Sequence, residues 1–213
     1  MADGILEQLK TAIIQGSSET VIVSVKNALK DGIPIERIIQ DGMVSGIQVV
    51  GKLFGDGEYY LPELLVSGKA MLAALEVIEP ELAKIGESFH VGNFLIGTVK
   101  GDMHNIGKNI VTMMLKGNGW KVTDLGVDVP PEKICEALEQ GDYDIFGMSA
   151  LLTTTLPAAA ETIDAIKKAG LREKMKIMVG GAPVTQEYCD KIGADEYARD
   201  AWEAVTKAKR LIN

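Results

Sequence analysis

The chain of 213 residues has few of the features on which several protein classes depend. Its two cysteines, Cys135 and Cys189, are too few for a disulfide framework or a four-cysteine zinc site. It has no apolar run near the roughly 20 residues that a membrane helix needs. Its N-terminus also lacks the basic and then apolar order of a signal peptide. We therefore expect a cytoplasmic protein that does not associate with a membrane.

Basic residues are also scarce in this sequence. The 22 Lys and Arg residues are outnumbered by 30 Asp and Glu residues, which gives a net charge of −8. Such a balance is unfavourable for a protein that binds the phosphate backbone, so we expect no nucleic-acid partner. Hydrophobic residues nevertheless make up 46% of the chain, which is typical of a globular protein. At roughly 150 residues per domain, the length allows one or two domains.

The spacing of apolar residues changes near residue 89. Before that point it is helical, and Pro34 and Pro62 each suit the first turn of a helix. We expect Pro80 to kink or interrupt the last of these helices, because proline has no N–H to donate. Four helices with short links predict a small bundle, which we assign as an N-terminal domain over residues 1–89.

Residues 90–213 repeat the order strand, glycine-rich loop, helix. We expect strands over 93–98, 121–125, 144–149, 175–179 and 195–198, and helices over 105–117, 131–140, 155–169, 184–192 and 200–212. Alternating strands and helices predict a doubly wound parallel sheet with right-handed crossovers. The fold class is therefore α/β, with a four-helix bundle followed by a Rossmann-like (flavodoxin-like) domain of about five strands.

Two polar segments follow the first and third predicted strands. The first strand leads into residues 101–107 (GDMHNIG), and the third ends at Ser149, followed by Leu151 and the threonines at 153–155. In open α/β sheets, ligands bind beyond the carboxyl ends of the strands, where the strand order reverses. We expect the two segments to meet at that crevice.

His104 is one of two histidines, and Asp102 lies two residues before it. A carboxylate that accepts the proton of one ring nitrogen makes the other nitrogen a better metal donor. A single histidine, with no acid or cysteine at zinc spacing, does not form a zinc site. It suffices, however, for a metal that a macrocycle already holds. The alternative is that Asp102 caps a helix and His104 is an ordinary loop residue.

The spacing of the motifs carries a family resemblance. The pattern consists of Asp102-x-His104-x-x-Gly107, 41 residues (108–148), Ser149-x-Leu151, 28 residues (152–179), and Gly180-Gly181. It resembles the cobalamin-binding signature, and TVKGDMHNIGKNIV is similar to the corresponding stretch of cobalamin-dependent methionine synthase. The segment from Phe54 to Pro62 resembles the cap domain of that family. The best match is to the free-standing corrinoid proteins of methanogen and acetogen methyltransferase systems.

The resemblance implies a bound cobalamin or related corrinoid, with specific roles for single residues. His104 would replace the cofactor's own benzimidazole as the lower axial cobalt ligand. Asp102 would bind the other imidazole nitrogen, and Thr155 stands where the family has a relay serine. Phe54 and Leu61 would shield the upper, methyl-bearing face. The residues implied to contact the cofactor in the second domain are Gly101, Asp102, Met103, His104, Asn105, Ile106, Gly107, Ser149, Leu151, Thr153, Thr155, Gly180, Gly181, Tyr197, Ala198 and Asp200. The glycines among them would leave room for the displaced nucleotide tail.

The function implied by the resemblance is that of a methyl carrier rather than a complete enzyme. Co(I) would accept a methyl group from a substrate:corrinoid methyltransferase. Methyl-Co(III) would then deliver it to a second methyltransferase that acts on tetrahydrofolate or a thiol acceptor. A reductive activase is the third implied partner. The methyl donor stays open between methanol, methylamines, quaternary amines and methoxyaromatics.

Other functions fit the sequence less well. The cobalamin-binding subunits of adenosylcobalamin mutases share the Asp-x-His motif but generally lack a helical cap. Cobalamin-dependent regulators add a DNA-binding domain, for which this chain has neither the length nor the basic charge. A hydrolase is disfavoured because Leu151 replaces the second glycine of a nucleophile elbow at Ser149, and no histidine follows that serine. A dinucleotide-binding enzyme is disfavoured because the residues after the first strand do not contain the Gly-x-Gly-x-x-Gly motif that it would need.

Overall fold

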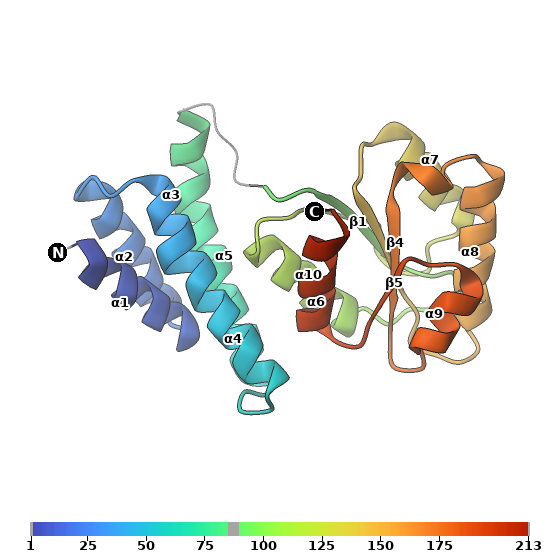
Figure 1. Ribbon diagram of the computed structural model, residues 1–213, viewed down its shortest axis with the longest axis horizontal. Coiled ribbons are helices and arrows are strands. Elements are labelled where there is room, and N and C mark those ends of the chain that lie inside the picture. Colours follow the sequence, from blue (N-terminus) through green and yellow to red (C-terminus); the bar gives the residue numbers. More distant parts are fainter. Residues whose placement is uncertain (1, 85–89, 213) are drawn as a thin grey trace. The chain divides into compact units, whose positions relative to one another are not determined.

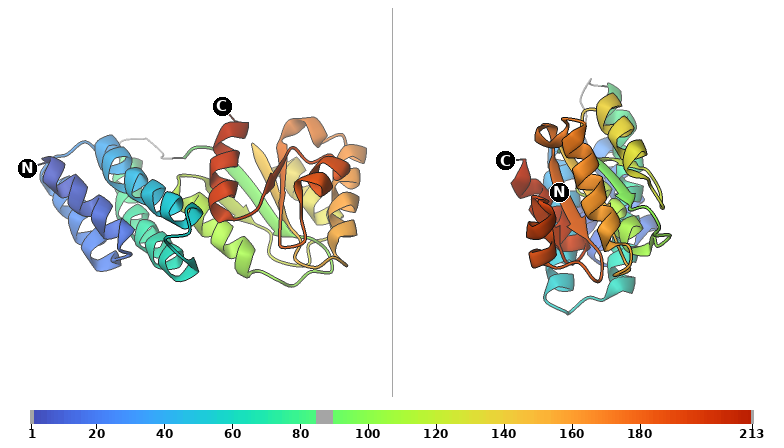
Figure 2. Two further views of the ribbon diagram at one scale, coloured as in Figure 1. Left: turned by 60° about the horizontal axis from the view of Figure 1, so that its bottom comes forward. Right: turned by 90° about the vertical axis from the view of Figure 1, so that its right-hand side faces the viewer.

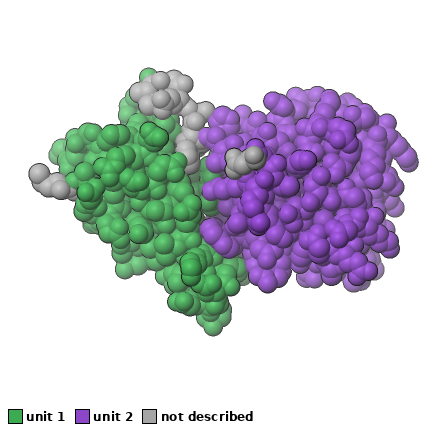
Figure 3. Space-filling model, in the orientation of Figure 1, with its two compact units in different colours: residues 1–89, 116–119 green, residues 90–115, 120–213 purple. Residues whose placement is uncertain are grey.

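The computed structural model describes residues 2–84 and 90–212, which belong to two compact units (Figures 1 and 3). The first unit comprises residues 1–89 with Lys116–Gly119, and the second comprises His90–Leu115 and Trp120–Asn213. The domain boundary that we expect after residue 89 adjoins residues 85–89, which lie outside the described part. That boundary stays a prediction.

The first unit is built from four helical segments. These are α1 (Ala2–Ile14), α2 (Ser18–Lys30), a run formed by α3 (Ile35–Arg37), η1 (Ile38–Val44) and α4 (Ser45–Gly55), and α5 (Leu61–Lys84). Their facing sides bury apolar residues completely, among them Leu9, Ile13, Val25, Met43 and Met71. The helical spacing of these residues is what the sequence predicts for a bundle. None of the helices in the described part of the chain is both long and apolar enough to cross a membrane.

Two helices of this unit differ from the expectation. The third predicted helix contains a π-helical stretch, η1, whose Gly42 faces Leu9 so closely that a Cβ would lie 2.6 Å from a side-chain carbon. The fourth helix, α5, is not interrupted at Pro80 but continues to Lys84. Ile78 and Leu82 are buried on either side of the proline. Their packing offsets the backbone hydrogen bond that proline cannot make.

The second unit contains a parallel sheet with the strand order β2-β1-β3-β4-β5. Its strands are β1 (Asn93–Thr98), β2 (Lys121–Asp124), β3 (Ile145–Ser149), β4 (Lys176–Gly180) and β5 (Glu196–Ala198). Its helices are α6 (Ile106–Gly117), α7 (Pro131–Gln140), α8 (Leu156–Lys168), the short 3₁₀ turn η2 (Arg172–Lys174), α9 (Gln186–Ile192) and α10 (Ala201–Leu211). The predicted doubly wound architecture is confirmed, and η2 is an element that the sequence analysis did not predict.

The sheet is buried on both faces, which explains its short apolar strands. Figures 1 and 2 show α7, α8 and α9 on one face and α6 and α10 on the other. Leu95, Phe146 and Ile177, from the three central strands, are fully buried in one continuous core cluster. Phe94 packs edge-on against Trp120, with ring centroids 5.7 Å apart.

The strand order places the loops after β1 and β3 side by side. β1 pairs with β2 on one side and β3 on the other, and Thr98 at the end of β1 lies opposite Ser149 at the end of β3. The chain reverses its winding direction between these two strands, so their carboxyl ends form the expected crevice.

Candidate functional site

The loop between β1 and α6, residues 99–105, presents the aspartate and histidine of the motif. Gly101 has φ +82°, a conformation that glycine adopts without steric cost, and the Asp102 N–H donates to the Val99 carbonyl at 3.1 Å. The resulting turn buries the Asp102 side chain completely, while the His104 side chain is 50% exposed. The motif therefore combines a buried carboxylate with an accessible imidazole. Because α6 begins only at Ile106, Asp102 lies too early in the chain to be the N-cap of that helix, which removes that part of the alternative considered above.

One oxygen of Asp102 holds His104. Asp102 Oδ1 lies 2.8 Å from His104 Nδ1 and also accepts the His104 backbone N–H at 3.0 Å. An ionised carboxylate has no hydrogen to donate, so Nδ1 must carry the proton in this pair. The lone pair of a neutral imidazole is then on Nε2, which is the nitrogen left available to a metal.

The other oxygen of Asp102 binds the loop after β3. Asp102 Oδ2 accepts the Leu151 N–H at 2.7 Å and lies 2.9 Å from Thr155 Oγ1. Thr155 Oγ1 is equally close to the Leu152 carbonyl, and its single hydrogen favours the charged acceptor. The structure thus brings together His104, Asp102 and Thr155, as the sequence predicts.

The Asp102 carboxyl is held in its ionised form. Burial alone would raise its pKa, because a charge is disfavoured away from water. The hydrogen bonds from the backbone of His104 and Leu151, from the His104 ring and from Thr155 act in the opposite direction and lower the pKa to about 2. The group is therefore a permanent acceptor at neutral pH.

Exposed apolar side chains surround the polar array, which we define as His104, Asp102 and Thr155. Met103 and Ile106 are 68% and 73% exposed on either side of His104, and Leu151 and Leu152 are 37% and 42% exposed in the loop after β3. Large apolar residues that gather at the surface commonly mark a binding site. A rim of this kind around one accessible imidazole fits a broad, largely apolar macrocycle whose metal lacks one axial ligand.

The glycines of the motifs fall into two groups. A Cβ at Gly107 would meet no atom within 4 Å, so space is open there as expected. Gly181 has φ +132°, and a Cβ there would lie 1.8 Å from the carbonyl oxygen of Ala150. A Cβ at Gly180 would lie 2.9 Å from the carbonyl oxygen of Ala198. These two glycines are therefore required by close backbone packing, which is a different reason from the room for a ligand that we expected.

The other predicted residues lie in several settings. Asn105 and Thr153 are exposed in the two loops next to the array, and Ser149 is half-buried at the end of β3. Tyr197 and Ala198 belong to β5. Asp200 accepts the Glu203 N–H at 2.8 Å as the N-cap of α10, which accounts for an aspartate there without a ligand.

Phe54 and Leu61 belong to the helical unit. Phe54 is half-buried in the last turn of α4, and Leu61 is 41% exposed at the start of α5. Tyr60, directly before Leu61, is 68% exposed. These residues provide an accessible apolar surface on that unit.

Sequence reasoning missed two residues that support the loop and a buried lysine in the helix that follows it. The hydroxyl of Thr98, a fully buried residue, donates to the His104 carbonyl at 3.0 Å. Asp128 Oδ1 accepts the Gly101 N–H at 2.6 Å. Lys108, only 3% exposed in the first turn of α6, pairs with Asp124 at the end of β2. Asp128 lies 27 residues from Gly101, and nothing in the local sequence indicates that contact.

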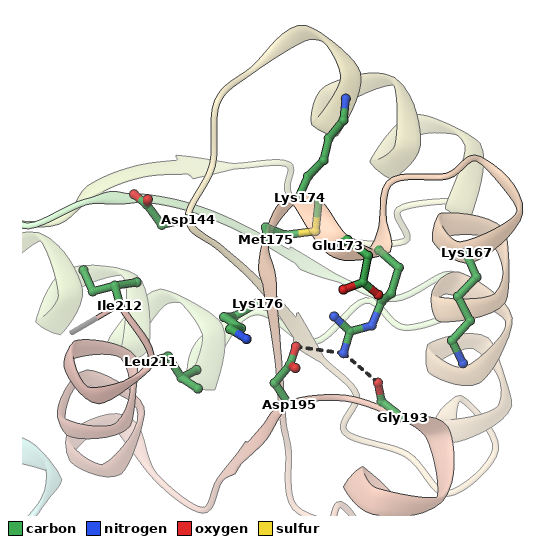
Figure 4. Close-up of a pocket in the computed structure, with 11 residues that line it drawn as sticks. Asp144, Lys167, Glu173, Lys174, Met175, Lys176, Gly193, Asp195, Leu211 and Ile212 are labelled. Carbon is green, nitrogen blue, oxygen red and sulfur yellow. Dashed lines mark hydrogen bonds and ion pairs between the residues drawn. The ribbon is translucent and has the colours of Figure 1, made fainter.

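A hollow lies at the opposite ends of the same strands. It has a volume of about 680 Å³ and is lined by residues such as Asp144 before β3, Lys176 at the start of β4, and Asp195 (Figure 4). Arg172 donates to Asp195 at 2.9 Å and to the Gly193 carbonyl at 3.1 Å, so its guanidinium is already engaged. Ligands of such sheets bind at the carboxyl ends, so the functional site is expected there.

Comparisons with known proteins indicate the family of the chain. A family described as B12 binding domain matches residues 92–206, and a second family with the same description matches residues 5–79. The chain is 43% identical over 208 residues to dimethylamine corrinoid protein 1 of Methanosarcina mazei, covering 98% of this chain and 96% of that protein. It is 40% identical over 210 residues to the trimethylamine corrinoid protein of Methanosarcina barkeri, covering 98% and 97%.

A similar solved structure is the methanol:cobalamin methyltransferase complex from Methanosarcina barkeri. One chain of this complex superposes on the protein with a TM-score of 0.86 at 30% identity. The match covers 99% of this chain and 80% of the chain in the complex.

Proposed function

The chain belongs to the family of corrinoid proteins with two B12 binding domains, and on that premise we propose that it is a methyl carrier whose cobalt is ligated by His104. When bound, the corrinoid supplies a cobalt atom that receives a methyl group from one protein and releases it to another. The observation that carries the proposal is the hydrogen-bonded array of His104, Asp102 and Thr155 at the carboxyl ends of β1 and β3.

In this proposal the array tunes a single nitrogen. His104 Nε2 would hold the cobalt, and Asp102 keeps the proton on Nδ1 and so increases the donor strength of Nε2. Thr155 donates to the carboxylate and moderates that effect.

The rim around the array seats the macrocycle. Met103, Ile106, Leu151 and Leu152 offer apolar contact, and the open space at Gly107 admits the displaced nucleotide tail. The remaining proposed contacts are Gly101, Asn105, Ser149, Thr153, Gly180, Gly181, Tyr197, Ala198 and Asp200. For the helical unit we propose a shielding role over the upper face of the corrinoid, through Phe54 and Leu61.

Corrinoid proteins are subunits of methyltransferase systems, and we propose three partners for this chain. They are a substrate-specific methyltransferase, a second methyltransferase that uses tetrahydrofolate or a thiol acceptor, and a reductive activase. The relatives described above are named for dimethylamine and trimethylamine, which supports a methylamine as the donor. The chain alone has no methyltransferase activity in this proposal, because its site holds the cofactor and the donor binds to the partner.

Electron paramagnetic resonance of the cobalt(II) state tests the ligand assignment. In protein grown with ¹⁵N-histidine, we expect the axial nitrogen splitting to change from three lines to two, because the nuclear spin changes. His104→Ala should abolish the histidine splitting, whereas His90→Ala, the matched control, should keep it. A splitting that does not respond to the histidine label would show that benzimidazole or water is the ligand, and the proposal would fail.

A further inference from the structure

We propose that Thr98 and Asp128 are positioning residues that hold the axial-ligand loop, residues 99–105, in the geometry in which His104 ligates cobalt. The inference rests on the proposed function, because loop geometry affects the cofactor only if His104 is its ligand. Neither residue belongs to the motifs from which the site was predicted. Both act on the main chain of the loop, whereas Asp102 acts on the histidine side chain.

Thr98 is a fixed donor beneath His104. It is the last residue of β1 and is fully buried. Its N–H donates to the Gly126 carbonyl and its own carbonyl accepts the Val129 N–H, both at 3.0 Å. With the backbone locked on both sides, the hydroxyl reaches the His104 carbonyl at 3.0 Å. Thr98 therefore sets the distance between the sheet and the main chain of the histidine.

Asp128 holds the other end of the loop and does so in an unusual conformation. Its φ of +51° makes it the one non-glycine residue in the described ranges with a left-handed backbone. Aspartate tolerates this region better than most residues, but it still costs free energy relative to the ordinary conformations. Such strain persists where the surroundings enforce it, and it is common at functional sites.

Two hydrogen bonds enforce this conformation. Asp128 Oδ1 accepts the Gly101 N–H at 2.6 Å, and the Asp128 N–H donates to the Asp102 carbonyl at 3.0 Å. The next residue, Val129, forms a parallel bridge with Val99 at the start of the loop. The segment after β2 thus fixes the residues that precede His104, and Thr98 fixes His104 itself.

Matched variants separate hydrogen bonding from shape. Thr98→Val removes the hydroxyl at nearly constant volume, and Thr98→Ser retains it. Asp128→Asn keeps an acceptor and tolerates the left-handed conformation, Asp128→Ala loses both, and Asp128→Gly relieves the strain but loses the acceptor. Asp128→Gly keeps the test decisive if Asp128→Ala fails to fold.

The first measurement uses the cofactor-free protein. We expect the Gly101 amide proton to resonate far downfield and to exchange slowly in wild type, because it donates to a carboxylate at 2.6 Å. Asp128→Gly and Asp128→Ala should shift it upfield and speed its exchange, and Asp128→Asn should lie between. An amide signal that is unchanged in Asp128→Gly would overturn the role of Asp128.

The second measurement is the Co(II)/Co(I) midpoint potential of the reconstituted protein. Losing one hydrogen bond of the loop should weaken the ligation of Co(II) by His104 about fivefold. If His104 ligates Co(II) but not Co(I), that change would raise the midpoint by about 40 mV, at 59 mV per tenfold for one electron. We expect this shift in Thr98→Val, Asp128→Ala and Asp128→Gly, and wild-type values in Thr98→Ser and Asp128→Asn.

The His104→Ala variant separates the two proposals. If it raises the midpoint while Thr98→Val and Asp128→Gly do not, the loop residues are merely structural and this inference is overturned. If His104→Ala itself leaves the midpoint unchanged, the ligand assignment of the proposed function fails, and this inference fails with it, whatever the amide signals show.

Discussion

The two ends of the parallel sheet are built from the same strands, yet their polar groups are arranged differently. At the carboxyl ends, one fully buried carboxylate, Asp102, accepts four hydrogen bonds, and an accessible imidazole is attached to it. At the amino ends, a hollow is lined by charges of both signs, and its guanidinium at Arg172 is paired with Asp195. Polar groups that are held in place and include an accessible metal-binding nitrogen indicate a ligand site. A hollow lined by charges that are already paired is weak evidence for such a site.

The largest effect that would distinguish the two ends is expected from Gly181→Ala, at the carboxyl end of β4. The new Cβ would lie 1.8 Å from the Ala150 carbonyl oxygen, in a backbone conformation that favours glycine. We expect a loss of at least about 3 kcal/mol of unfolding free energy, measured by urea denaturation. Gly170→Ala, at a φ of +71° and with no neighbour within 4 Å, is the control for the milder strain of an ordinary left-handed backbone. Equal losses in both variants would contradict the close packing described here.

Asp102→Asn should have the next largest effect on the free energy of unfolding of the cofactor-free protein. The pKa of Asp102 falls from its ordinary value of 3.8 to about 2 on folding, which corresponds to about 2 kcal/mol of stabilisation at neutral pH. Because the folded-state pKa is the lower one, the stabilisation is present above pH 4 and is lost as the pH falls toward 2. The gap between wild type and Asp102→Asn should therefore close over that range in urea titrations. A gap that is independent of pH would show that the charge of Asp102 contributes nothing.

Arg172→Ala tests the amino end of the sheet. The variant loses a partly buried ion pair with Asp195 and a hydrogen bond to the Gly193 carbonyl, so about 1 kcal/mol of stability should be lost. Corrinoid affinity, followed by absorbance titration, should stay at the wild-type value. A clear fall in that affinity would mean that the amino-end hollow takes part in cofactor binding.

Gly107→Ala should have the smallest effect on stability, and with the opposite sign. The position lies in the first turn of α6, and a Cβ there meets no atom within 4 Å. Alanine should stabilise the cofactor-free protein by about 0.5–1 kcal/mol, because glycine is the poorer helix former. If the nucleotide tail uses this space, corrinoid affinity should fall even though stability rises. Unchanged affinity would remove Gly107 from the proposed tail site.

The sequence predicts most of the fold because the signals are local. The alternation of apolar strands and amphipathic helices places each predicted element of the second unit within two residues of its observed bounds. The contact between Asp102 and His104 is also local, since it spans two residues of one loop. The outcome at Pro80 is different, because the burial of Ile78 and Leu82 on either side of it outweighs the local preference of proline.

By itself, then, the sequence determined the two kinds of architecture, and it predicts a site at the ends of β1 and β3 with His104 as its histidine. Only the tertiary structure decided which distant groups complete it. Leu151 and Thr155 reach Asp102 across about 50 residues, and Asp128 reaches Gly101 across 27. The motif spacing marks Thr155 as a candidate, but no local pattern marks Asp128. Its left-handed backbone and its hydrogen bond arise only when β2 and β1 pair and the segments that follow them are brought together.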